Sequence, residues 1–325
     1  MTRFDSRRRV STYTSVWMPT GDETAQAVAG YIGGGRNASN VNQSGIDKIS
    51  FTDDSKSTLS ATLTTARFLM GGFANSSVAG YFAGGGDLAS TYLSGIDKIT
   101  FPADTKTTLS ATLTSARRVT GCFANSGVAG YICGGENSSA LYLSAIDKIT
   151  FSDDSKSTLS ATLSGNRVYN AGLANSGVAG YSGGGGDTSG SVSTIDKITF
   201  SADSKSTLSA TLTETVSDLR GMANSGTAGY FCGGSTAVYL SRIDKITFST
   251  DSKSTLSATL TSGVQGMGAM ANSGVAGYVG GGEVVGTAVS RIDKITFADD
   301  SKSTLSATLS STNKYSSAFA DSGIL

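Results

Sequence analysis

The sequence contains no histidine, and its 325 residues include only two prolines, one tryptophan and three cysteines. Histidine is the commonest general base and a frequent metal ligand, so its absence removes the usual starting point for acid–base and metal chemistry. We therefore predict that the protein is not an enzyme and that it holds no metal and no cofactor.

The chain also lacks net charge and long apolar runs. It has 25 basic and 25 acidic side chains, a balance that argues against a general electrostatic grip on nucleic acid or on an anionic membrane. No segment approaches the roughly 18 apolar residues of a membrane span. Residues 1–27 lack the apolar core of a secretory signal, so we expect no export through such a signal.

The cysteines are odd in number and lie in strand-like stretches, at Cys122, Cys133 and Cys232. A disulfide framework or a metal site would need a regular set of such residues. We expect free thiols that act as small apolar side chains.

What the sequence does contain is a repeat, first visible as VAGYFAGGG at residues 78–86. Near-copies recur along the chain, and their tyrosines are Tyr31, Tyr81, Tyr131, Tyr181, Tyr230 and Tyr278. The steps between them are 50, 50, 50, 49 and 48 residues. A period of this size indicates a repeat architecture.

Each repeat divides into four strand-length pieces and shows no helical spacing. In residues 67–113 we predict strands at 69–74, 78–83, 96–101 and 108–113, with turns at 75–77 and 104–106. The last strand is inferred from Leu109, Ala111 and Leu113, which alternate with polar residues as in a half-buried strand. The fold class predicted is all-β, with four antiparallel strands per repeat.

Four short strands repeated about every fifty residues are typical of a β-propeller blade. The repeats begin at 28–35 with a second strand, and residues 314–325 match a first strand. We therefore predict a six-bladed propeller over 28–325, closed when the C-terminal strand completes the N-terminal blade. Residues 1–27 form a separate N-terminal segment.

The order of Arg67, the diglycine Gly84-Gly85, a hairpin at Asp104 and Arg117 resembles the kelch repeat, over about residues 28–325. The sequence departs from kelch at the usual tryptophan of the fourth strand, where leucines such as Leu109 stand. The near-identical IDKITF…KSTLSATL copies are similar to kelch-like repeats of bacteriophage virion proteins, such as tail fibres. This resemblance implies a virion location; otherwise we expect a cytoplasmic protein.

The six copies differ mainly in the loops at one face of the predicted disc. Loops on a rigid scaffold commonly carry recognition, and Tyr and Arg commonly carry binding energy. The predicted contact set is Tyr92, Tyr142, Tyr239, Arg118, Arg167, Arg242 and Arg291. A structural role, pairing with carboxylates, is favoured for Arg67, Arg117 and Arg167. The Asp and Lys of each IDK, such as Asp97 and Lys98, are expected to form local pairs.

The N-terminal segment holds Arg7, Arg8, Arg9 and Trp17. It is either a disordered leader or a docking segment, and Val10–Trp17 is rich in β-forming residues that could add to a neighbour's sheet edge. We favour docking onto other virion or assembly proteins.

The predicted function is non-enzymatic recognition or assembly in a phage virion, with a host glycan or surface receptor as a further partner. The alternative is a stand-alone lectin or kelch-type adaptor. A glycan-acting enzyme is less expected, because Arg67, Arg117 and Arg167 could form a partial arginine ring but no nucleophile with an oriented base is identifiable.

Overall fold

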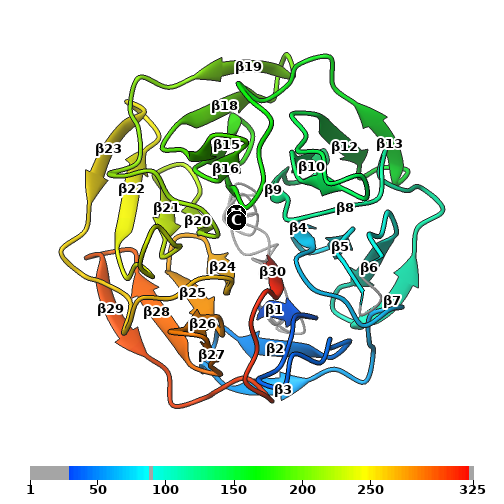
Figure 1. The fold of residues 1–325 in the computed structure, drawn as a ribbon. Helices are drawn as coiled ribbons and strands as arrows, with labels where there is room; N and C mark the ends of the chain where they lie inside the picture. The colour runs from blue at the N-terminus through cyan, green and yellow to red at the C-terminus, as the bar shows by residue number, and fades with distance from the viewer. Residues whose placement is uncertain (1–28, 88–90, 322–325) are drawn as a thin grey trace, which may run out of the picture.

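The computed structural model describes residues 29–87 and 91–321, and it is a β-propeller of six four-stranded antiparallel blades around one axis (Figure 1). This confirms the predicted fold class. No helix occurs among the described residues.

The strands of each blade run from the axis outward. Blade 1 contains β30 (Ser317–Asp321), β1 (Ala29–Gly33), β2 (Ile46–Ser50) and β3 (Lys56–Thr58). Blade 2 contains β4 (Gly71–Asn75), β5 (Ala79–Ala83), β6 (Ile96–Thr100) and β7 (Thr105–Thr108). Blade 3 contains β9 (Gly121–Asn125), β10 (Ala129–Cys133), β12 (Ile146–Thr150) and β13 (Ser155–Thr158).

The remaining blades repeat this order. Blade 4 contains β14 (Ala171–Asn175), β15 (Ala179–Gly183), β18 (Ile195–Thr199) and β19 (Ser204–Thr207). Blade 5 contains β20 (Arg220–Asn224), β21 (Ala228–Cys232), β22 (Ile243–Thr247) and β23 (Ser252–Thr255). Blade 6 contains β24 (Gly268–Asn272), β25 (Ala276–Gly280), β28 (Ile292–Thr296) and β29 (Ser301–Thr304).

Two-residue strands lie in the loops at one end of the blades. They are β8 (Arg117–Arg118), β11 (Glu136–Asn137), β16 (Gly186–Asp187), β17 (Gly190–Ser191), β26 (Glu283–Val284) and β27 (Thr287–Ala288).

The ring closes as predicted, through a blade assembled from both ends of the repeat region. β30 pairs antiparallel with β1 from Ala29 opposite Asp321 to Gly33 opposite Ser317. Figure 1 shows the red β30 beside the blue β1. Closure in this way gives the innermost strand of every blade two neighbours, and no innermost strand is left at an open end of the ring.

The tyrosine strand is the second strand of each blade, not the innermost. The diglycine at its end has a positive φ at both residues, 65° at Gly84 and 102° at Gly85. A Cβ on Gly84 would lie 2.5 Å from the carbonyl oxygen of Arg117, in the segment that enters the next blade. Glycine is required there by backbone conformation and by this crossing segment, away from the axis.

The predicted fourth strand at 108–113 is wrong in position. β7 spans Thr105–Thr108, and residues 109–113 belong to the segment that leads to the next blade. Leu113 is buried there and Leu109 packs partly buried against the same core. Apolar and polar residues alternate in this segment because one side of it is buried against the core. An extended connecting segment exposes alternate residues just as a strand does.

The hydrophobic core lies between successive blades. Tyr81 of blade 2 stacks on Phe151 of blade 3 with ring centroids 5.4 Å apart, and Phe73 stacks on Tyr81 at 5.1 Å. Both phenylalanines and the tyrosine are buried. Aromatic contacts of this kind recur at the other interfaces, so each blade buries its apolar surface only against its neighbours.

Each interface is also fastened by a turn aspartate of the next blade. Asp154 accepts hydrogen bonds from the Tyr81 hydroxyl at 2.8 Å and from Lys98 Nζ at 2.6 Å. All six interfaces repeat this arrangement, with Asp104, Asp154, Asp203, Asp251, Asp300 and Asp54 as acceptors. The expectation that the IDK lysines form local pairs is therefore wrong, because each one reaches into the following blade.

The IDK aspartate has a different role at the edge of the blade. Asp147 accepts hydrogen bonds from the Thr114 backbone N–H and hydroxyl, from Thr158 and from Arg117. Burial opposes its ionisation, but Arg117 and these hydrogen bonds outweigh burial, and the pKa of Asp147 is lowered. The carboxylate thus holds the connecting segment against the blade.

Candidate recognition surface

The propeller has two faces with different connections, and one of them is nearly uniform. The uniform face carries the turns between first and second strands and between third and fourth strands. Its inner turns are joined around the axis: the Ser76 N–H donates to the Ser126 hydroxyl at 3.0 Å, and the Gly127 N–H donates to the Asn75 side-chain oxygen at 2.8 Å. Equivalent bonds link the following blades.

The uniform face is also hollowed at its centre, by about 720 Å³. The described lining consists of small residues, mainly alanines and serines at the inner turns of blades 2 to 6, with Val78 and Asn75 beside them. Four valines at its rim are about half exposed, and blade 5 carries Thr227 at the same position. This hollow offers neither aromatic rings nor charged groups in its described lining.

The opposite face, here called the variable face, is organised by one residue from each blade. These six ring positions are Leu69, Val119, Tyr169, Asp218, Gly266 and Tyr315. Each backbone N–H donates to the carbonyl of the preceding ring position, over 2.5–3.3 Å, until the ring closes from Leu69 back to Tyr315. A closed belt of backbone hydrogen bonds therefore surrounds the axis.

Every ring position has a left-handed backbone, with φ between 55° and 61°. Only one of the six is glycine; Val119, Tyr169 and Asp218 adopt the same conformation. A left-handed backbone costs about 1–2 kcal/mol for a residue with a Cβ. The belt places five residue types, with tyrosine twice, in equivalent positions at a conformational cost, and such positions are common at functional sites.

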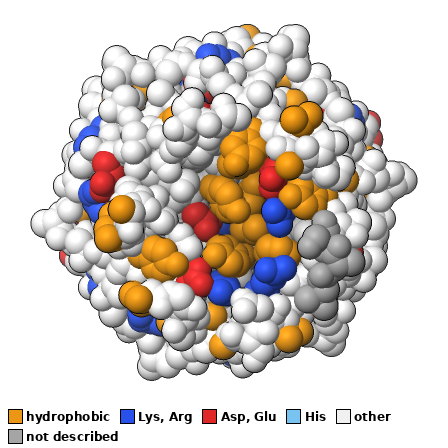
Figure 2. All heavy atoms as spheres, viewed as in Figure 1, with side chains coloured by type: hydrophobic (Ala, Val, Ile, Leu, Met, Phe, Trp, Pro, Cys, Tyr) orange, Lys and Arg blue, Asp and Glu red, His pale blue; other side chains and the backbone are white. Residues whose placement is uncertain are grey.

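Around the belt lies a central hollow whose one side is apolar. Phe68, Leu69, Val119 and Val168 form a buried cluster, against which Tyr142, Tyr169 and Tyr315 pack partly buried. Figure 2 shows this face hollowed at its centre, with hydrophobic side chains on the floor and charged side chains around them.

The other side of the hollow is polar and is formed by the segments that enter blades 4, 5, 6 and 1. Tyr169, Ser217, Asp218, Gln265 and Tyr315 line a space of about 170 Å³. Burial raises the pKa of Asp218, although Arg220 lies 3.1 Å away. Aromatic rings thus face hydroxyl, amide and carboxyl groups across one small space.

Glu283 forms the hub of the polar side. Its carboxylate accepts hydrogen bonds from Lys314 at 2.7 Å, Tyr315 at 2.8 Å and Gln265 at 3.0 Å. Burial opposes ionisation of Glu283, but these hydrogen bonds outweigh burial and lower its pKa. The hub fixes the position of the Tyr315 ring.

A second charged group borders the apolar side. Arg118 donates to Glu136 at 3.1 Å and lies over the Tyr92 ring, 4.5 Å from its centroid, while the Tyr92 hydroxyl donates to Glu136 at 2.9 Å. Arg36 lies over the Phe68 ring at 3.5 Å. The structure therefore brings together Tyr92 and Arg118 of the predicted contact set.

Tyr142 and Tyr239 also lie on the variable face, at different places. Tyr142 packs against the apolar cluster of the hollow. The hydroxyl of Tyr239 lies 3.4 Å from Glu283. Tyr239 also lines a groove of about 490 Å³ together with the exposed Val238 and Val285.

The other three arginines of the contact set interact with side chains of their own blades or connecting segments. Arg167 is 3% exposed, its guanidinium donates to Ser164 and Thr194 and lies 3.8 Å from Asp196, so it takes the structural role favoured for it and is not an accessible contact residue. Arg242 and Arg291 have their Nε atoms 3.7 and 3.6 Å from the IDK aspartates Asp244 and Asp293.

These arginines exchange places between blades. Arg67 and Arg117 reach Asp97 and Asp147 at 2.8 Å from the connecting segment, as the predicted structural role required. Blades 5 and 6 carry valine at that position, and their arginines approach the aspartate from the loop before the third strand. The guanidinium is kept near the carboxylate while its place in the sequence changes.

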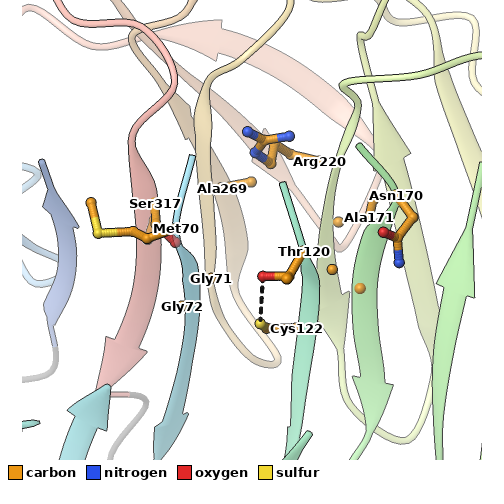
Figure 3. A pocket seen from close by; sticks show the side chains of 14 residues that line it. Met70, Gly71, Gly72, Thr120, Cys122, Asn170, Ala171, Arg220, Ala269 and Ser317 are labelled. Atoms are coloured by element: carbon orange, nitrogen blue, oxygen red, sulfur yellow. Dashed lines mark hydrogen bonds between the residues drawn. The ribbon is translucent and has the colours of Figure 1, made fainter. Parts of the chain in front are cut away.

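The axis below the hollow is narrow. Blades 2, 3 and 4 line it with the small residues Gly71, Gly121 and Ala171, whereas blade 5 contributes the large side chain of Arg220 (Figure 3). The remaining space is about 50 Å³. Arg220 donates to the Leu219 carbonyl and to Asp218. Cys122 also lines this channel as a free thiol, and burial raises its pKa to about 12. Arg220 narrows this end of the channel, below the hollow.

Sequence reasoning missed most of the hollow, namely Arg36, Phe68, Tyr169, Asp218, Glu283, Lys314 and Tyr315. A signal was present: the ring position always lies two residues after the place of Arg67, so aligning the connecting segments reveals a position in one register that holds five different residue types in six blades. The predicted docking residues Arg7, Arg8, Arg9 and Trp17 lie outside the described residues.

Within 29–87 and 91–321 there is no cluster of three or more potential metal ligands, and there is no helix that could cross a membrane. No protein-family model matches the chain, and a search of curated proteins found no similar sequence.

Proposed function

We propose that this propeller is a non-enzymatic recognition module whose ligand binds in the central hollow of the variable face. The observation that carries the proposal is the meeting of aromatic rings and convergent polar groups in one small concavity on a rigid belt. Concave sites with an apolar lining and a few fixed polar groups are typical of ligand binding.

The wider setting is proposed from the sequence alone. The kelch-like repeat and its similarity to phage virion repeats favour a virion component, such as a tail fibre, that binds a host surface or a virion partner. A stand-alone lectin or kelch-type adaptor is the alternative. Both proposals use the same hollow.

Attachment to a larger assembly is assigned to the N-terminal segment. Removing residues 1–20 leaves every described strand in place, since β1 begins at Ala29. We expect the shortened protein to melt like the full chain and to fail to incorporate into its assembly. Normal incorporation would contradict the docking role of Arg7, Arg8, Arg9 and Trp17.

Glycan cleavage is a second candidate, favoured by one arrangement. Tyr315 donates to Glu283 at 2.8 Å, and Asp218, whose pKa burial raises, lines the same space. A phenol and two carboxyl groups are among the groups that glycosidases use. However, Lys314 and Gln265 also bind Glu283 and its pKa is lowered, which makes it a weak base for Tyr315.

The recognition proposal is tested by screening the full chain against an immobilised panel of neutral and acidic oligosaccharides. Tyr169→Ala should abolish binding that the native chain shows. The matched control is Val128→Thr with Val178→Thr on the uniform face, where blade 5 already carries threonine. Binding that survives Tyr169→Ala, or is lost in the control, would refute the proposal. Cleavage of panel members by the native chain would favour the enzyme instead.

A further inference from the structure

The charged side chains around the central hollow do not balance. Three cations have carboxylate partners: Lys314 with Glu283 at 2.7 Å, Arg118 with Glu136 at 3.1 Å and Arg220 with Asp218 at 3.1 Å. The fourth cation, Arg36, has no carboxylate oxygen of the described residues within 4.0 Å. Among the residues that the structure describes, Arg36 is therefore the one cation of this group without a carboxylate partner.

Arg36 is held in place by neutral contacts. Its Nε donates to the Asn42 side-chain oxygen at 2.9 Å, and its guanidinium carbon lies 3.5 Å from the centroid of Phe68. Backbone hydrogen bonds with Lys314 fix the same residue at 2.7 and 2.9 Å. A guanidinium held over a ring keeps its outer N–H groups available and loses little freedom on binding.

A second arginine shares this ring. The guanidinium carbon of Arg118 lies 5.9 Å from the centroid of the Phe68 ring. Burial, and then the charge of Arg118, lower the pKa of Arg36, so the two cations repel each other across a half-buried site. An anion bound beside Arg36 would relieve that repulsion and would form charge-assisted hydrogen bonds.

The same place adjoins the polar side of the hollow through the rings of Phe68 and Tyr315. Phe68 and Tyr315 have ring centroids 6.5 Å apart, and Tyr315 lines the space shared with Tyr169, Ser217, Asp218 and Gln265. Two tyrosine rings offer stacking surfaces, and the hydroxyl, amide and carboxyl groups offer partners for several hydroxyls. A polyhydroxylated ring uses this set more fully than an aliphatic acid side chain does.

We propose that the hollow binds an anionic saccharide, with its acidic group on Arg36 and its ring among Tyr169, Tyr315 and Gln265. This inference rests on the proposed recognition function and specifies its ligand. Arg36 binds the acidic group, and the positive charge of Arg118 nearby adds to the attraction. The polar side of the hollow forms hydrogen bonds with the sugar hydroxyls.

The test measures affinity by calorimetry at low and at physiological salt, using trigalacturonate, its methyl ester, 6-sulfated lactose and lactose. We expect an acidic probe to bind, its neutral counterpart to bind at least tenfold more weakly, and the difference to shrink with salt. Trigalacturonate and its methyl ester test for recognition of a carboxylate, and 6-sulfated lactose and lactose test for recognition of a sulfate. Arg36→Gln should weaken the acidic probe roughly ten- to hundredfold and leave its neutral counterpart unchanged.

Controls separate this inference from the function on which it rests. Lys156→Gln removes a cation at the uniform face, where its Nζ contacts Thr114 and Thr158, and should leave affinity unchanged. If acidic and neutral probes bind equally and only Tyr169→Ala matters, the anionic ligand is wrong and recognition stands. If a tetraglutamate peptide binds as tightly as the acidic sugar, the saccharide class is wrong. If no probe binds, or binding ignores both Arg36 and Tyr169, both proposals fail.

Discussion

The two faces of the propeller differ in what their residues are bonded to, and this difference changes what their variation means. On the uniform face the turns repeat because their side chains hold neighbouring blades together: Asp154 binds Tyr81 and Lys98, and Ser126 binds the turn of blade 2. On the variable face the loops differ from blade to blade. The belt beneath them is made by backbone hydrogen bonds, which do not depend on the side chain at each position.

Turns that repeat beside loops that vary would favour a function for the loops only if both were equally free to change. The turns are not free, because Asp154 and its five equivalents fasten every interface. Loop variation alone therefore says little, and the case for recognition depends on the chemistry of the hollow.

The largest effect is expected below both faces, at the buried pair of Arg117 and Asp147. Both side chains are fully buried, at 0% exposure. Asp147→Asn leaves Arg117 without a counter-charge and should lower the free energy of unfolding by about 3–5 kcal/mol. Urea denaturation measures it. The exposed turn residue Asp153 provides the control, and an equal loss for Asp153→Asn would contradict the assignment.

A smaller effect is expected at the uniform face itself. Asp154→Gly removes the acceptor of Tyr81 and Lys98, while glycine tolerates the φ of 54° at this position. We expect a loss of about 1–2 kcal/mol in the free energy of unfolding. The matched change on the variable face is Val285→Gly, at a φ of 46° and 87% exposure, which should cost less than about 0.5 kcal/mol. Equal losses would remove the contrast between the faces.

Acid should act through the IDK aspartates. Hydrogen bonds and arginines outweigh burial, so the pKa values of Asp97, Asp147 and Asp293 are lower in the folded state than the unfolded value of about 3.9. Their stabilisation is complete above that pH and is lost as pH falls through the folded pKa values. We expect stability to be flat from pH 7 to 5 in respect of these groups and to fall below about pH 4.

Asp147→Asn sharpens that test, because it removes one of the three titrating groups. Its free energy of unfolding should fall less steeply with acid than that of the native chain. An unchanged slope in melting experiments between pH 5 and pH 3 would mean that other carboxylates drive acid unfolding.

Much of the fold could be predicted from the sequence because a repeat states the same local information six times. Closure followed from matching residues 314–325 to a first strand. The partners of Lys98 could not be found in this way, since Asp154 lies 56 residues away and belongs to the next blade. The misplaced fourth strand has a similar cause: Leu109 and Leu113 alternate because a neighbouring blade covers them.

The site was predictable only in part. Tyr92, Tyr142 and Arg118 were found from residue type and loop position, and they border the hollow. Tyr169 and Tyr315 were missed because they lie in connecting segments whose backbone bends inward at the belt. Arg242 and Arg291 take the place of an arginine that the connecting segments of blades 5 and 6 lack, and their membership of the contact set stays a prediction.

The most direct test of the account is a hydrogen-exchange footprint of the full chain, measured by mass spectrometry with and without the saccharide that binds most tightly. Protection should be confined to the variable face, in peptides that contain residues 36, 68–69, 168–169, 217–218, 265 and 314–315. Protection of the turns at 76–78, 126–128 and 176–178 instead, with the hollow unchanged, would contradict the claim that the variable face is the recognition surface.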